Sequence, residues 1–92
     1  KPSAFLINTA RGPIVNQKDL SKALNEGIIA GAALDVFDEE PIDKNAPILK
    51  AKNTILTPHI AYKTEEALLR RAQITLDNIV NFGKGKRQNR VD

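Results

Sequence analysis

The chain has 92 residues, of which 41% are hydrophobic and 27% charged, a composition typical of one soluble globular domain and a length too short for two. The lack of cysteine excludes a disulfide framework and thiolate catalysis, and a single histidine argues against a zinc site, so we expect no metal. No apolar run approaches the roughly 20 residues that cross a bilayer, and no signal-peptide pattern opens the chain. We therefore expect a cytoplasmic protein without a membrane partner.

The formal net charge is +3, and the basic excess is concentrated in residues 84–92. A basic tail can bind nucleic acid, but this one contains no aromatic residues and no recognition motif. We therefore interpret residues 84–92 as a solvated tail that follows a domain of residues 1–83, and we expect no nucleic-acid partner.

The first half of the chain predicts a strand, a helix and a second strand. Residues 4–8 form an apolar run that predicts a strand buried on both faces. Asn16 is the expected N-cap of a helix, with Asp19 three residues later, and Gly27 suits its exit. Residues 29–36 are rich in small apolar side chains and predict a central strand, which closes a right-handed βαβ unit.

The second half predicts one more strand and a long helix. Residues 38–52 contain two prolines and predict an irregular surface connection. Residues 54–57 predict a short third strand, and residues 64–83 have the apolar spacing of a helix. The expected fold is α/β, with about three parallel strands in the order βαββα and flanking helices.

Polar side chains follow each of the three predicted strands. Arg11 follows the first strand, Asp35 and Glu40 follow the second, and His59 follows the third. The carboxyl ends of parallel strands lie along one edge of a sheet, where ligands bind, so we expect these four residues to converge. Each residue alone has a plain structural interpretation, as a turn cap, a surface ion pair or a solvated loop, and the functional interpretation depends on their shared position.

The residue types suit acid–base chemistry on an anion. Arg11 can donate two parallel hydrogen bonds to a carboxylate. His59 exchanges a proton near neutral pH, and Glu40 is the candidate carboxylate that would fix its tautomer. Asp35 lies in an apolar context and needs a hydrogen-bond partner, either a backbone turn or a ligand donor such as an amide.

Three segments together resemble the D-isomer-specific 2-hydroxyacid dehydrogenase family in their order and spacing. They are residues 8–12 (NTARG), 31–41 (GAALDVFDEEP) and 57–61 (TPHIA), and the resemblance extends to Phe82. It implies a partial Rossmann-like sheet and an oxidoreductase that transfers a hydride between NAD(H) and a small 2-oxo or 2-hydroxy acid. Tyr62-Lys63 resembles the bulkier residues of some hydroxypyruvate and glycerate dehydrogenases.

The resemblance also implies a role for each site residue. Arg11 would hold the substrate carboxylate and polarise the oxo group, His59 would be the general acid, and Glu40 would orient His59. Asp35 would bind the nicotinamide carboxamide. Ala10, Arg11, His59 and Ala61 would also contact the cofactor, which we expect to be NAD.

The sequence has no G-x-G-x-x-G fingerprint for a pyrophosphate. We therefore expect residues 1–83 to be the second half of an NAD-binding Rossmann domain that is inactive by itself. Exposed strand edges predict self-association, and we expect a homodimer. The alternative function is a non-enzymatic, NAD-responsive scaffold similar to transcriptional corepressors, because the family resemblance extends to such proteins.

Overall fold

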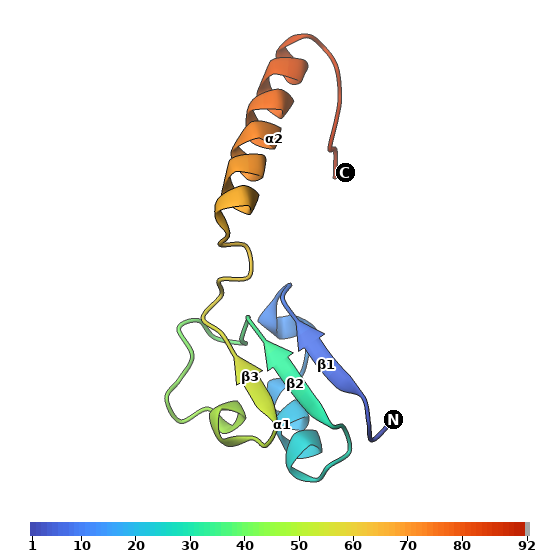
Figure 1. The fold of residues 1–92 in the computed structure, drawn as a ribbon, viewed down its shortest axis with the longest axis vertical. Helices are drawn as coiled ribbons and strands as arrows, with labels where there is room; N and C mark the ends of the chain where they lie inside the picture. Colours follow the sequence, from blue (N-terminus) through green and yellow to red (C-terminus); the bar gives the residue numbers. More distant parts are fainter. Residues whose placement is uncertain (92) are drawn as a thin grey trace. The chain divides into compact units, whose positions relative to one another are not determined.

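The computed structural model describes residues 1–91, which form two compact units, residues 1–61 and the segment from Tyr62 onward. The elements, shown in Figure 1, are β1 (Phe5–Asn8), the 3-10 helix η1 (Gly12–Ile14), α1 (Gln17–Asn25), β2 (Gly31–Leu34), the 3-10 helix η2 (Pro47–Lys50), β3 (Thr54–Leu56) and α2 (Glu65–Gly83). The strands form one parallel sheet in the order β1-β2-β3. The predicted α/β class and the three-stranded parallel sheet are confirmed.

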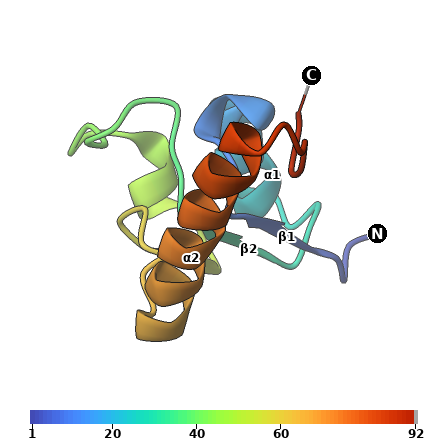
Figure 2. The ribbon, with the colours of Figure 1, turned by 90° about the horizontal axis from the view of Figure 1, so that it is seen from above.

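One face of this sheet carries the hydrophobic core of the first unit. Figure 2 shows α1 and η2 on the same side of the strands. Side chains alternate along a strand, so every second strand residue points to that side. The buried core residues are Leu20 and Leu24 of α1, Ala32 and Leu34 of β2, Phe37, and Ile48 of η2. Because Ile48 is completely buried, the predicted surface connection of residues 38–52 is wrong at this point, where η2 contributes to the core.

The opposite face of the sheet is exposed in the first unit, so the prediction that residues 4–8 are buried on both faces is wrong there. Phe5 and Ile7 of β1 are each 73% exposed, and Ile55 of β3 is 69% exposed. The strand register places Ile7 and Ile55 in one row, because Ile7 pairs with Ala33 and Ala33 with Ile55. An uninterrupted apolar run predicts two buried faces, whereas α1 and η2 both cover the same one.

Local signals set the limits of α1. The Asn16 side chain accepts a hydrogen bond from the Asp19 backbone N–H at 3.1 Å, as expected of an N-cap. At the other end Gly27 has a φ of +70°, which glycine adopts without steric cost. The Ile28 N–H donates to Ala23 O at 2.9 Å, and the Gly27 N–H donates to Leu24 O at 3.2 Å, so the helix closes with a Schellman motif.

The second unit contains α2 and the basic tail. Thr64 caps α2 by accepting a hydrogen bond from the Ala67 N–H, and Gly83 is the last helical residue, as the sequence predicts. Residues 84–91 of the tail have no regular structure, but Gln88 and Asn89 both donate to Asn78 Oδ1, so this segment turns back along α2. Among the described residues no helix is both long and apolar enough to span a membrane.

Candidate active site

The turn after β1 presents Arg11. Asn8 is buried at the end of the strand, and its side chain holds both sides of the turn. Its Nδ2 donates to Arg11 O at 2.9 Å, and its Oδ1 accepts from the Ala10 N–H at 3.1 Å. The exposed guanidinium donates from Nη1 to Ala10 O at 2.7 Å. A positive charge is thereby placed at the carboxyl end of β1.

Gly12 brings this turn into backbone contact with the segment after β2. A Cβ atom on Gly12 would lie 1.9 Å from Phe37 O and 2.6 Å from the Asp38 nitrogen. No side chain fits there, because such separations lie far inside van der Waals contact. The close approach sets the position of Arg11 relative to the loop that carries Glu40.

Glu40 links that loop to the only histidine. Its Oε2 lies 2.7 Å from His59 Nδ1, and its Oε1 accepts a hydrogen bond from the Phe37 N–H at 3.1 Å. The pKa of Glu40 is lowered, first by the hydrogen bond with His59 and second by that with the Phe37 N–H. Desolvation raises this pKa by less, and the charges of His59 and Arg11 lower it a little further. Glu40 is therefore an ionised carboxylate that is held by the Phe37 N–H and contacts the imidazole ring.

Asp35 is buried at the end of β2, with 4% of its surface exposed. Its Oδ1 accepts from Thr57 Oγ1 at 2.6 Å and from the Ile60 N–H at 2.9 Å, and its Oδ2 accepts from the Ala61 N–H at 2.8 Å. The Thr57 hydroxyl is the main cause of a lowered pKa of Asp35; the two backbone N–H groups and the His59 charge add to it, and desolvation opposes it. A carboxylate has about four acceptor positions, so one remains on Oδ2 for a ligand.

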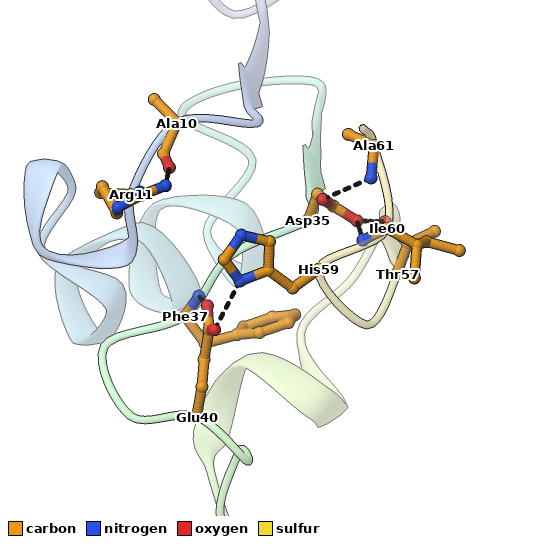
Figure 3. A network of polar contacts seen from close by, with 9 residues as sticks. All are labelled: Ala10, Arg11, Asp35, Phe37, Glu40, Thr57, His59, Ile60 and Ala61. Atoms are coloured by element: carbon orange, nitrogen blue, oxygen red, sulfur yellow. Dashed lines mark hydrogen bonds and ion pairs between the residues drawn. The ribbon is translucent and has the colours of Figure 1, made fainter. Parts of the chain in front are cut away.

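Figure 3 shows how the predicted site residues lie. His59 is between Glu40 and Asp35, and Arg11 and Ala10 come from the neighbouring turn. Ala61 contacts the site through its N–H. The sequence interpretation did not name Asn8 and Thr57 as site residues, although both are polar residues at a strand end, the same signal that identified Arg11 and His59: Asn8 is the last residue of β1, and Thr57 directly follows β3.

A groove of about 300 Å³ opens beside Asp35. Its walls include Ile7, Ala33, Ile55 and Ile60, and its polar edge includes Thr9 and Thr57. An apolar floor beside a carboxylate acceptor suits a flat aromatic ring that carries an amide, which is the chemistry of a nicotinamide. The residues present are therefore compatible with the reactive end of a nicotinamide cofactor.

In open parallel α/β sheets, including those of nucleotide-binding domains, ligands bind outside the carboxyl ends of the strands, where this chain presents Arg11, the His59–Glu40 pair and the groove. The family model described as "D-isomer specific 2-hydroxyacid dehydrogenase, NAD binding domain" matches residues 1–61, and the chain belongs to this family. The resemblance inferred from the three motifs is confirmed. The matched residues coincide with the first compact unit.

Two of the similar relatives are named as reductases. The glyoxylate reductase of Thermofilum pendens is 52% identical over 86 residues, which cover 94% of this chain and 25% of that enzyme. The hydroxypyruvate reductase of Blautia hydrogenotrophica is 41% identical over 92 residues, which cover 100% of this chain and 29% of that enzyme. The chain therefore spans about a quarter of the length of the curated relatives it matches.

A solved relative has the same fold. The D-isomer specific 2-hydroxyacid dehydrogenase from Xanthobacter autotrophicus Py2, in complex with NADPH and MES, gives a TM-score of 0.82 at 37% identity. The match covers 99% of this chain and 37% of that one. The family description and this complex together support a nicotinamide dinucleotide, NAD or NADP, as the cofactor class.

Proposed function

We propose that this chain is the catalytic half of the NAD-binding domain of a D-2-hydroxyacid dehydrogenase that reduces a small 2-oxo acid such as glyoxylate or hydroxypyruvate. The observation that carries the proposal is the 2.7 Å contact between His59 Nδ1 and Glu40 Oε2, with Arg11 on the adjacent turn. In this proposal residues 1–83 belong to the domain and residues 84–92 form a tail. We further propose NAD as the cofactor, a cytoplasmic location and a homodimeric enzyme.

The site residues divide the chemistry between them. Arg11 binds the substrate carboxylate and stabilises negative charge on the oxo group. With Nδ1 bonded to Glu40, His59 transfers the proton to the carbonyl oxygen from Nε2. The reduced nicotinamide supplies the hydride when it is bound. In the reverse direction His59 accepts the proton of the hydroxyl group, as microscopic reversibility requires.

Glu40 and Asp35 complete this arrangement. Glu40 is held by the Phe37 N–H and by His59, so it fixes the tautomer of the ring and offsets the charge of the imidazolium. The remaining acceptor position of Asp35 would receive the carboxamide of the nicotinamide, beside the backbone of Ala10 and Ala61. The residues of this chain thus position the substrate and the nicotinamide and stabilise the charge that develops during the reaction. They include no G-x-G-x-x-G fingerprint for the pyrophosphate of the cofactor.

The test is NADH oxidation by the full-length enzyme with glyoxylate, hydroxypyruvate and pyruvate as substrates. We expect turnover with at least one acid, and a loss of about 10²- to 10⁴-fold in kcat/KM for His59→Ala, the range for a general acid. Arg11→Ala should raise KM and lower kcat, while Lys18→Ala, an exposed cation of α1, is the matched control. If Arg11→Ala and His59→Ala turn over as fast as the wild type, these roles are refuted. If the wild type shows no turnover with any of the acids, the scaffold function is favoured.

A further inference from the structure

The turn that carries His59 has an unusual backbone. His59 has a φ of +55°, in the left-handed region that residues other than glycine rarely adopt. Within the turn, the His59 N–H donates to Thr57 O at 3.1 Å. A conformation of this kind persists only where the surrounding structure fixes it.

One carboxylate, that of Asp35, accepts three hydrogen bonds from this turn. Asp35 accepts hydrogen bonds from Thr57 Oγ1 before His59 and from the N–H groups of Ile60 and Ala61 after it. The three donors lie 22 to 26 residues from Asp35 in sequence. The turn is therefore attached to β2 on both sides of the histidine.

Asp35 is itself well anchored. Its own N–H donates to Asn8 O at 3.0 Å, and the Thr57 N–H donates to Leu34 O at 3.0 Å, so the parallel ladder continues past the strand ends. The carboxylate is buried and its three bonds are short. It can therefore hold the turn so that the ring of His59 keeps its 2.7 Å contact with Glu40 and presents Nε2 for proton transfer.

We propose that Asp35 and Thr57 act together as positioning residues for His59, a role separate from any contact of Asp35 with the cofactor. This inference rests on the proposed function, because it assigns a role within the same reaction. Thr57 is its distinguishing element, since the hydroxyl group is bound to Asp35 and is not part of the acid–base pair. A displacement of about 1 Å in a reacting group can cost on the order of 10²-fold in rate.

The test compares Thr57→Val, which keeps the shape and loses the hydroxyl, with Thr57→Ser, which keeps the hydroxyl and loses the methyl. In the full-length enzyme we expect Thr57→Val to lower kcat about 10- to 100-fold, while KM for the 2-oxo acid changes less than about twofold. Thr57→Ser should stay within about threefold of the wild type in kcat. Equal effects of both variants, or a Thr57→Val enzyme as active as the wild type, would overturn the inference.

A second readout does not depend on turnover. Loss of the Asp35–Thr57 bond should speed amide hydrogen exchange at Ile60 and Ala61, which donate to the same carboxylate. The Ala10 amide, which donates to Asn8, is the internal control and should not change. Unchanged exchange at Ile60 and Ala61 in Thr57→Val would refute the positioning role. If the wild-type protein shows no turnover with any acid but Thr57→Val still exchanges faster at these amides, the proposed reaction alone is refuted. If Thr57→Val does not fold by circular dichroism, Thr57→Ala replaces it with the same expected outcomes.

Discussion

Replacing Gly12 with alanine tests the contact between the Arg11 turn and the loop that carries Glu40. The new Cβ would lie 1.9 Å from Phe37 O, 2.0 Å from Phe37 C and 2.6 Å from the Asp38 nitrogen. These are backbone atoms, so no change of rotamer relieves the overlap. Reaching even 3.0 Å requires one segment to move by about 1 Å, at the upper end of the usual overpacking cost of about 1–3 kcal/mol.

We expect Gly12→Ala to lower the free energy of unfolding by about 3 kcal/mol, or the Tm by roughly 12 to 24 °C for a domain of this size. Urea and thermal unfolding followed by far-UV circular dichroism would measure it. Gly83→Ala is the control, since its Cβ meets nothing within 4 Å and should be neutral or stabilising by up to about 1 kcal/mol. An unfolding free energy of Gly12→Ala within about 0.5 kcal/mol of the wild type would refute the reasoning.

Three further results are expected. Asn16→Ala removes the N-cap of α1 and should cost about 1 kcal/mol in urea unfolding; no change would show that the cap is dispensable. The pKa values of Asp35 and Glu40 are lowered in the folded state, so the stability they contribute is present above about pH 4.5 and is lost as pH falls through the folded values. Acid unfolding of Asp35→Asn should therefore show a weaker pH dependence than the wild type, and an identical curve would contradict this linkage. Replacing Ile7 and Ile55 with threonine should lower the average mass that light scattering measures, because it removes apolar surface from the exposed sheet face. An unchanged mass would show that this face is not involved in self-association.

The limits of the helices follow from signals that lie next to them in the sequence. Asn16 and Thr64 cap the helices they precede, and Gly27 ends α1 with a positive φ, so a few neighbouring residues decide each boundary. The parallel pairing of β1 with β2 also follows from the helix predicted between them. Local chemistry of this kind is readable in a single sequence.

The contacts within the site required the structure, because they join distant parts of the chain. The sequence indicated that Asp35 needs a partner and left a backbone turn and a ligand donor both open. The structure supplies Thr57, Ile60 and Ala61, which no local pattern around Asp35 identifies. The exposed face of β1 was likewise unpredictable, since apolar composition does not say which of two faces a helix will cover.

The pairing of His59 with Glu40 lies between these cases. Residue type and position at strand ends made Glu40 a candidate, and the structure places its carboxylate on His59 Nδ1. The dependence of Arg11 on Gly12 was not evident, because glycine after arginine is common and only the backbone of Phe37 shows why no side chain is tolerated.

The compact unit of residues 1–61 contains Arg11, Glu40 and His59 together. Their mutual geometry is therefore set within this single unit. Recombination between relatives could therefore exchange this segment as one piece, and the proposed arrangement for proton transfer would be exchanged with it.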